Sequence, residues 1–309
     1  MIKPVPAKAR IGRFFRLILP AAIILVCGFL VFLGFLVNRV IHPGAVPEPV
    51  NPSSYLMTSL DVHWTANDGF QMTGWWIPGL PSRPGILLVP GLGMGKSDAL
   101  SLALLLHQDG FNVLVYDVRG SGTSPQIASS LGLQDTDDML AALRYVKSRR
   151  DLDVKRLGIW GVDVGARAAL QASAAFPEVR AIAADGAYER VLDMVDVRVR
   201  ETFGLQNRLL ELGCRQAFRI MHIGAISLLN KRLDLDALSD RSILCIVGEN
   251  RKDLGRLTNA IYLRLRPQKE ITTLRTSRIR TMSGEELRDY DRQVATFFHL
   301  NLPDADRHM

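Results

Sequence analysis

Apolar and polar positions form short alternating blocks along most of the chain, and these blocks predict strands and helices in turn. Two strand-like runs, 58–65 and 70–77, flank Asn67-Asp68-Gly69 and predict a hairpin. Further strands are predicted at 85–89, 111–116, 156–160, 181–184, 243–247 and 271–274. Helical periodicity predicts helices at 97–108, 137–147, 164–175, 254–265 and 285–298. This alternation predicts an α/β domain with a mostly parallel central sheet and helices on both faces.

One segment departs from the alternation. From Tyr188 to Ser239 the pattern is helical throughout, with no strand-like run. A loop of that length without structure is uncommon inside a compact domain. We therefore predict a helical cap, inserted at about 188–240 into a domain that covers residues 57–309.

The N-terminal region contains one uninterrupted apolar run. Leu17–Val37 is 21 residues without a charge. As a helix it would reach roughly 31 Å, the thickness of a hydrocarbon core. A cleaved signal peptide is the alternative, but its apolar region is shorter and ends at a small-residue site, which the flank Asn38–His42 lacks. We predict one uncleaved transmembrane helix at 17–37, with the lipid bilayer as its partner.

Charge gives this anchor an orientation. The net charge is +7, but the first forty residues hold six basic groups and no acid, which leaves 32 basic against 31 acidic residues in the rest. That balance argues against a nucleic-acid-binding face. Five of the six basic groups precede the apolar run, in a predicted basic cytoplasmic tail at 1–16. The positive-inside rule then predicts a single-pass protein whose N-terminus is cytoplasmic and whose main domain is extracytoplasmic.

The segment after the apolar run is rich in proline. Four prolines fall within ten residues: Pro43, Pro47, Pro49 and Pro52. Proline stiffens the chain and opposes a helix. We predict a linker at 38–56 that acts as a stalk between the bilayer and the domain.

Four segments of the main domain carry a resemblance to a known family. They are Thr73–Pro78, Leu88–Gly93, Ile159–Gly165 and the D-x-R-G-x-G-x-S turn within Tyr116–Ser124. In their chain order they resemble the α/β-hydrolase superfamily, and they are similar to its membrane-anchored, serine-hydrolase-like branch, related to serine aminopeptidases and dienelactone hydrolases. The resemblance covers about Thr58 to Leu302 and implies an α/β-hydrolase fold with a helical cap. Three cysteines exclude a four-cysteine zinc site, and we expect no metal and no cofactor.

The family's nucleophilic serine lies at the centre of a G-x-S-x-G elbow, whose glycines permit a sharp turn between strand and helix. In this sequence Gly161 and Gly165 flank Asp163, so the serine is absent. A carboxylate can itself be a nucleophile, as in the haloalkane dehalogenases and epoxide hydrolases of the superfamily. Alternatively, Asp163 only caps the following helix, because Asp is a preferred N-cap residue.

The resemblance places the general base in the loop after the last strand, residues 276–285, where no histidine occurs. His222 in the predicted cap could lean over the site, whereas His299 lies in an apolar context that indicates a structural role. Without a histidine, neither the serine nor the aspartate version of this chemistry has its usual base.

The family's acid position aligns with Arg251, a cation. Three acids could substitute for it: Asp185, Glu189 and Asp253. We hypothesise instead that Asp163 and Arg251 form a charge pair in the place of the former triad.

Two further features concern binding. By the resemblance, the backbone N–H groups of Leu92 and Val164 occupy the oxyanion-hole positions, where they could bind a carboxylate or carbonyl without any reaction. A basic cluster follows the last two predicted strands: Arg264, Arg266, Lys269, Arg275, Arg278 and Arg280. It is either a solvated surface or a contact for anionic lipid headgroups or an acidic partner.

We therefore expect a membrane-anchored, catalytically impaired hydrolase-fold protein that acts as a binding or interaction module for a small molecule or an acidic partner. The alternative is an active hydrolase of a small ester, amide, halide or epoxide that uses Asp163 as nucleophile. A histidine nitrogen within hydrogen-bond reach of the Asp163 carboxylate would favour the enzyme.

Overall fold

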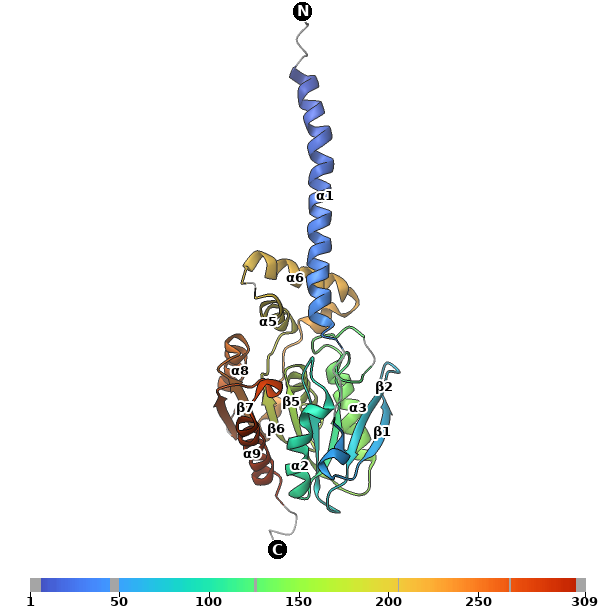
Figure 1. Ribbon diagram of the computed structural model, residues 1–309, viewed down its shortest axis with the longest axis vertical. Coiled ribbons are helices and arrows are strands. Elements are labelled where there is room, and N and C mark those ends of the chain that lie inside the picture. Colours follow the sequence, from blue (N-terminus) through green and yellow to red (C-terminus); the bar gives the residue numbers. More distant parts are fainter. Residues whose placement is uncertain (1–6, 45–49, 125–126, 205, 267, 304–309) are drawn as a thin grey trace, which may run out of the picture.

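The computed structural model describes residues 7–44, 50–124, 127–204, 206–266 and 268–303, with side chains from residue 19 onward. Residues 1–6 of the predicted tail, 45–49 of the predicted linker and 304–309 of the predicted domain lie outside the described residues. A long helix, α1 (Ala7–Ile41), projects from an α/β domain along the long axis of the molecule (Figure 1).

Eight strands form one sheet in the order β1-β2-β4-β3-β5-β6-β7-β8. They are β1 Leu60–Thr65, β2 Gln71–Ile77, β3 Pro84–Val89, β4 Asn112–Tyr116, β5 Asp153–Val162, β6 Val179–Asp185, β7 Ser242–Gly248 and β8 Lys269–Leu274. Strand β2 is antiparallel to both neighbours, and all the remaining pairs are parallel. The predicted mostly parallel sheet is confirmed. The carboxyl ends of β3 and of β5 to β8 therefore lie along one edge of the sheet, where α/β folds place their sites.

Helices cover both faces of the sheet. Helices α2 (Leu100–Gln108) and α9 (Gly284–Asn301) pack on one face, and α3 (Asp135–Ser148), α4 (Val164–Ser173) and α8 (Lys252–Arg264) pack on the other. Successive side chains of a strand point to opposite faces. Within β5, Ile159 accordingly joins one buried apolar cluster and Trp160 the other. The sheet is thus buried on both sides, which is why its central strands are continuous apolar runs.

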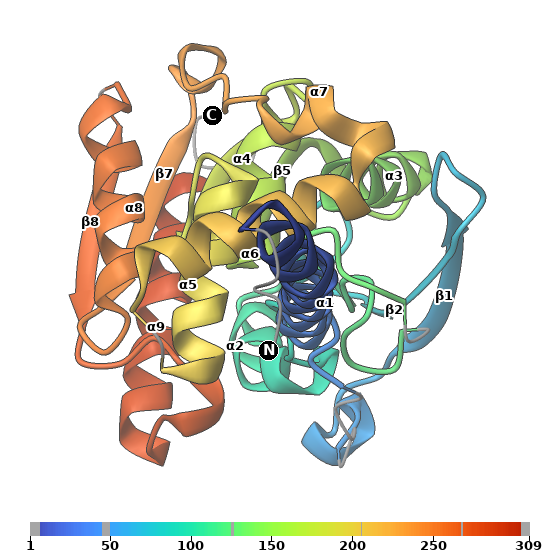
Figure 2. The same cartoon turned by 90° about the horizontal axis from the view of Figure 1, so that it is seen from above.

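The segment between β6 and β7 is helical. It forms α5 (Val191–Phe203), α6 (Arg208–Met221) and α7 (Ile226–Leu229), with short 3-10 turns between and after them. These helices lie on the side of the domain from which α1 projects (Figures 1 and 2). We call them the cap from here on.

Helix α1 ends later than the predicted anchor does. It runs to Ile41, so residues 38–41 of the predicted linker are helical. Its last turns bury five apolar side chains: Leu33, Leu36, Val37, Val40 and Ile41. Helix α1 touches α5 and α6, and it passes so close to α6 that a β-carbon at Gly213 would lie 2.8 Å from Leu33. The predicted linker therefore begins after Ile41 and not at residue 38, and its role as a stalk stays a prediction. The helix packs directly on the cap because its apolar pattern continues past Val37.

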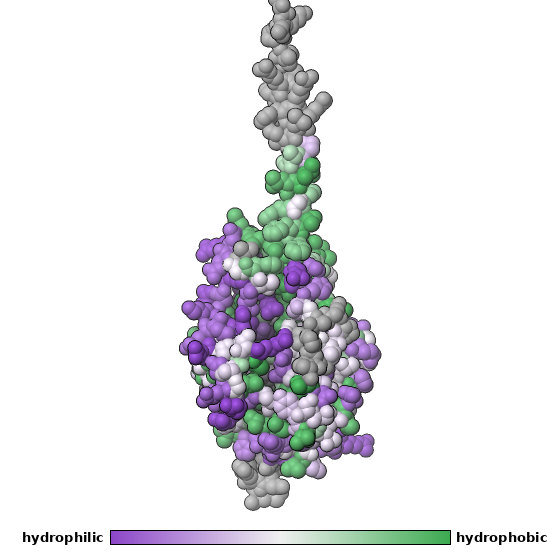
Figure 3. Space-filling model, in the orientation of Figure 1, coloured by the Kyte–Doolittle hydropathy of each residue, from purple (hydrophilic) through white to green (hydrophobic). Residues whose placement is uncertain are grey.

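The residues Leu19–Ile41 of α1 are long and apolar enough to cross a membrane. Beyond the cap, the apolar side chains of α1 are exposed, as Figure 3 shows where the helix emerges from the domain.

Candidate functional site

Asp163 lies at the sharp turn between β5 and α4. Its φ of 52° and ψ of −108° are a conformation that a non-glycine residue rarely adopts. A β-carbon at Gly161 would lie 2.5 Å from the backbone of Gly165, and one at Gly165 would lie 2.6 Å from the carbonyl oxygen of Val89. Any side chain at either glycine would thus overlap the backbone. The elbow glycines are required by packing, whether or not the site reacts.

The Asp163 carboxylate is held by Arg251. The Nη1 of Arg251 donates to Asp163 Oδ1 at 2.6 Å, and its Nη2 donates to Oδ2 at 3.1 Å. Asp163 is 4% exposed and Arg251 6% exposed. The hypothesised charge pair is confirmed. The helix-cap interpretation is wrong, because within the described residues the Asp163 side chain makes no capping hydrogen bond to α4.

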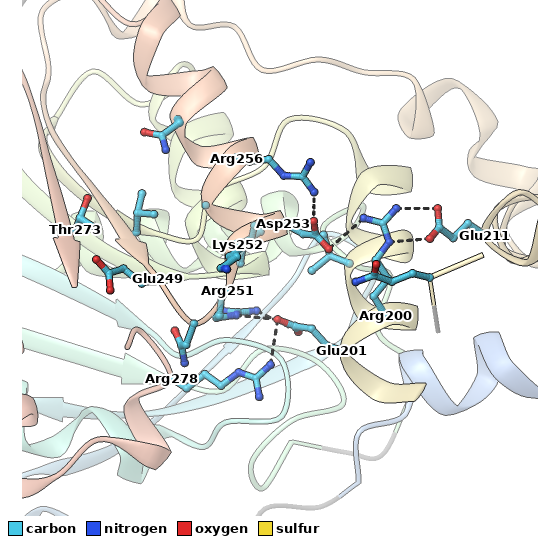
Figure 4. A pocket seen from close by; sticks show the side chains of 18 of the residues that line it. Arg200, Glu201, Glu211, Glu249, Arg251, Lys252, Asp253, Arg256, Thr273 and Arg278 are labelled. Carbon is cyan, nitrogen blue, oxygen red and sulfur yellow. Dashed lines mark hydrogen bonds and ion pairs between the residues drawn. The ribbon is translucent and has the colours of Figure 1, made fainter. Parts of the chain in front are cut away.

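Arg251 is itself fixed by the cap. Its Nε donates to Oε1 of Glu201, in α5, at 2.9 Å. Arg278 and Arg198 also approach the Glu201 carboxylate, at 3.3 and 3.5 Å. Figure 4 shows Arg251 and Arg278 converging on Glu201. Burial disfavours the Glu201 carboxylate, but these cations hold its pKa below its usual value.

A second ionic cluster lies beside this one, in a cleft of about 1070 Å³. Arg200 of α5 donates to both carboxylate oxygens of Glu211, at 2.7 and 2.8 Å, and to Asp253 at 3.1 Å (Figure 4). Arg256 also bonds to Asp253. Asp253, one of the alternative acids, is therefore engaged away from Asp163 and joins the cap to α8.

The other two alternative acids have different surroundings. Glu189 pairs with Arg264 at 2.8 Å, on a part of the surface away from the elbow. Asp185 ends β6 beside Asp163, and its carbonyl oxygen accepts the Asp163 N–H at 2.9 Å. The Asp185 carboxyl is fully buried and accepts the Tyr290 hydroxyl at 2.9 Å. Burial raises the pKa of Asp185 to about 7, with Arg251 opposing and Asp163 reinforcing the rise. Of the three candidates, the structure brings only Asp185 to the elbow.

The histidines lie elsewhere. His222, at the end of α6, stacks on Phe218 at 4.2 Å between ring centroids, and its Nδ1 is 3.0 Å from the Phe218 carbonyl oxygen. His299 is half-exposed at the end of α9, 3.9 Å from Asp109. None of the described histidines hydrogen-bonds to Asp163. In the same described part of the chain, no group of three or more His, Cys, Asp or Glu side chains is placed to hold a metal ion.

A pocket of about 350 Å³ opens over Asp163. Besides Asp163, its lining includes Leu92 and five charged residues: Arg198, Glu201, Arg251, Arg278 and Arg280. Leu92 thus lies at the pocket, and Val164 directly follows Asp163 at the start of α4. Their role as oxyanion-type donors stays a prediction. The two carboxylates face four arginines, so the pocket has an excess of positive charge.

Comparisons with known proteins agree with this architecture. A family model described as the alpha/beta hydrolase fold matches residues 84–214. An esterase of Pyrococcus furiosus superposes with a TM-score of 0.64 at 19% identity, over 85% of this chain and 98% of that one. A dienelactone hydrolase of Anabaena variabilis gives a TM-score of 0.57 at 16% identity, over 80% and 99%. The chain therefore has the α/β-hydrolase fold, and residues 84–214 are similar to that family.

The curated relatives match a smaller part. An uncharacterized protein of Mycobacterium tuberculosis is 33% identical over 146 residues, 46% of this chain and 51% of the relative. The chain spans about half the length of these curated relatives. At identities below 20% the solved structures show the fold alone, so the chemistry of this chain has to be argued from its own residues.

In this chain the D-x-R-G-x-G-x-S turn is structural. Arg119 donates to Asp138 at 2.7 and 2.6 Å and to Asp68 at 2.6 and 2.9 Å. Asp117 accepts the backbone N–H groups of Lys96 and Thr123 at 2.6 and 2.9 Å. The turn therefore ties the hairpin, α3 and the loop after β3 together, below the elbow.

Sequence analysis missed three residues of the site. Glu201 and Arg198 lie in the cap, and nothing in their local sequence indicates that α5 faces the elbow. Tyr290, in α9, donates to Asp185 and accepts the Trp160 indole N–H at 2.9 Å. A buried aromatic in a predicted amphipathic helix gave no sign of this polar role, which depends on how α9 packs on the sheet.

Proposed function

We propose that this α/β-hydrolase-fold protein is anchored in a membrane, has lost hydrolysis, and binds a small anionic molecule in the pocket over Asp163. The observation that carries the proposal is the buried two-point contact between Arg251 and the Asp163 carboxylate. A nucleophilic carboxylate must direct a lone pair at its electrophile. Here each oxygen accepts a guanidinium hydrogen bond, and turning one oxygen to a substrate would break a buried ion pair.

The missing base supports the same proposal. A covalent ester on Asp163 would need an activated water for its release, which a histidine normally supplies. The position of the family's acid is occupied by Arg251, and the loop after β8 brings the buried Ser277 and the arginines Arg278 and Arg280 to the pocket. These groups bind anions better than they transfer protons, because an arginine is always charged at ordinary pH.

Charge supports an anionic ligand. Four arginines line the pocket with two carboxylates, and Asp98, 3.7 Å from Arg280, adds a third, so the positive charges still outnumber the negative ones. Arg278 and Arg280 are about half-exposed, and each guanidinium has five N–H donors in a planar fork that suits a carboxylate or phosphate. Arg280 uses one of its donors on the Gly93 carbonyl oxygen, at 3.1 Å, which fixes the side chain at the pocket.

Anchoring is the second part of the proposal. The apolar residues Leu17–Val37 would span the bilayer, with residues 1–16 in the cytoplasm and the α/β-hydrolase domain on the other side. Protease treatment of sealed vesicles tests the orientation, since a domain on the cytoplasmic side would be cut in inside-out vesicles only.

The experiment uses the purified full chain in detergent. Turnover of activated esters, haloalkanes and epoxides is compared with that of Asp163→Asn, and we expect no difference. Binding of a carboxylate and of inorganic phosphate is measured by calorimetry on the parent chain, on Arg280→Ala and on Arg292→Ala. Arg292 is the matched control, because it is exposed and paired only with the nearby Asp289 among described residues. Loss of binding in Arg280→Ala but not Arg292→Ala supports the ligand site.

The alternative, an active hydrolase that uses Asp163, is favoured by one observation: the strained elbow conformation is intact. Such strain often belongs to a working site. Turnover by the parent chain that disappears in Asp163→Asn would establish this alternative and refute the loss of catalysis.

A further inference from the structure

Helix α6 has an ionic side and an apolar side. Its ionic side faces the protein, whereas a surface helix normally turns its apolar side inward. Glu211 bonds to Arg200, and Arg215 bonds to Asp196, both in α5. Cys214 and Phe218 complete this inner side and are fully buried. The other side of a helix that meets water is normally polar. The inner side thus holds two of the four charged residues of α6, Glu211 and Arg215, so the composition of the outer side is informative.

The outer side of α6 is exposed and mostly apolar, with Gln216 as an exposed polar residue between Leu212 and Ile220. Leu209, Leu212 and Ile220 recur at helical spacing and are 78%, 54% and 67% exposed. The same surface continues through the next turn and α7, with four more exposed apolar residues: Met221, Ile223, Ile226 and Leu228. We call these seven residues the cap patch. A contiguous exposed apolar surface of this kind marks a protein or membrane contact.

The cap patch lies beside the helix that would cross the membrane. Seen along α1, α6 runs across the face of the domain next to α1, and α7 continues it (Figure 2). In the side view α6 lies across the direction of α1 (Figure 1). A helix that crosses a spanning helix in this way lies parallel to the plane of the bilayer. Figure 3 shows hydrophobic side chains gathered at this junction.

The point where α6 meets α1 sets the depth of α6 relative to the apolar run. Gly213 of α6 packs against Leu33, four residues before Val37, the end of the apolar run. Four residues of α-helix correspond to about 6 Å. Interfacial amphipathic helices bury their apolar face roughly 5–10 Å into the boundary between headgroups and acyl chains. If Leu17–Val37 spans the bilayer, α6 is held at the depth of such a helix.

We infer that the cap patch is immersed in the membrane interface, so that the bilayer itself covers the outer side of α6 and α7. This inference rests on the proposed anchoring by α1. Basic residues flank the patch at Arg208 and Arg219 and, just beyond α7, at Lys231 and Arg232. Cations at the edge of an immersed apolar face meet lipid phosphates favourably.

The immersed cap has a consequence for the ligand pocket. Pro43, two residues after the end of α1, lines the pocket over Asp163. Immersion of the cap patch therefore brings the mouth of this pocket to the membrane surface.

The test uses the full chain in vesicles of phosphatidylcholine and phosphatidylglycerol. An environment-sensitive fluorophore is attached to Leu212→Cys in the cap patch or, as the control, to Leu300→Cys in α9, which is 69% exposed and far from α1. Both variants carry Cys27→Ser, and the remaining cysteines Cys214 and Cys245 are buried. Nitroxide-labelled lipid is expected to quench the Leu212 label several times more strongly than the Leu300 label. Iodide in the water is expected to show the opposite order.

A third label, on the native Cys27 within the apolar run, reports the anchor independently. A Cys27 label quenched by lipid together with a Leu212 label quenched by iodide would overturn the inference and leave the anchoring intact. A Cys27 label that lipid does not quench would refute the anchoring and, with it, the inference. A Leu212 label shielded from both quenchers would show that a second copy or another protein covers the cap patch, and it would also overturn the inference.

Discussion

Replacing Arg251 by methionine tests how strongly the buried pair with Asp163 stabilises the elbow. Arg251→Met keeps much of the side-chain length but removes the charge and all the donors. It leaves the Asp163 carboxylate buried with no cation in contact, while Glu201 keeps its approaches to Arg198 and Arg278. The uncompensated charge on Asp163 is therefore the main effect.

The size of the effect follows from burial. Both partners are more than nine-tenths buried. Removing one partner of a buried pair costs about 3–5 kcal/mol, whereas an exposed pair contributes about 0–1 kcal/mol. With about 2–4 °C lost per kcal/mol for a domain of this size, the unfolding temperature should fall by roughly 6–20 °C.

The assay is thermal and denaturant unfolding of the parent chain and three variants in one detergent. The variants are Arg251→Met, Asp163→Asn and their combination. The double variant should recover roughly 1–3 kcal/mol over Arg251→Met, because the unpaired charge is gone and contacting residues couple by about that much. If Arg251→Met unfolds within about 0.5 kcal/mol of the parent, as a surface substitution does, the argument from burial is refuted.

Three further predictions concern the elbow glycine Gly161, the buried Asp185 and the turn residue Arg119. Gly161→Ala should lose about 1–3 kcal/mol of unfolding free energy, because its β-carbon meets the backbone of Gly165, whereas Gly224→Ala, with no atom within 4 Å, should change little. Because burial raises the pKa of Asp185 to about 7, from about 3.9 when unfolded, its stabilising contribution is complete below about pH 4 and is lost as pH rises through 7. Asp185→Asn should therefore become more stable relative to the parent as pH rises over that window, and unchanged relative stability would contradict this. Arg119→Ala should cost about 3 kcal/mol in the same unfolding assay, and Arg119→Lys should restore only part of it, because an ammonium cannot reproduce the forked contacts.

Each predicted strand and helix of the α/β domain matches an observed one, for a physical reason. Strands buried on both faces must be continuous apolar runs, and amphipathic helices must repeat at 3.6 residues, so these elements are visible locally. The start of the linker was predicted four residues too early, because proline content indicates where a helix stops only approximately. Helix α1 continues to Ile41, since the first proline after the apolar run is Pro43.

The candidate site, too, has some features that could be predicted from the sequence and others that could not. The absence of serine at the elbow, of histidine after the last strand, and of an acid at Arg251 could all be read from position in the sequence. The Asp163–Arg251 pair could be hypothesised, because both residues follow parallel strands whose carboxyl ends share an edge. Whether Asp163 caps its helix or pairs with Arg251 could not be read, since one residue type suits both roles.

The sequence by itself determined the order of strands and helices, the apolar N-terminal run and the residue types at the elbow and after the last strands, because these depend on local periodicity and spacing. Only the tertiary structure decided which charges meet. Glu201 reaches Arg251 across fifty residues because α5 folds over the elbow, and the apolar side of α6 faces outward because its charges pair with α5. Contacts between distant segments depend on how the elements pack, and that packing is not encoded in any one of them.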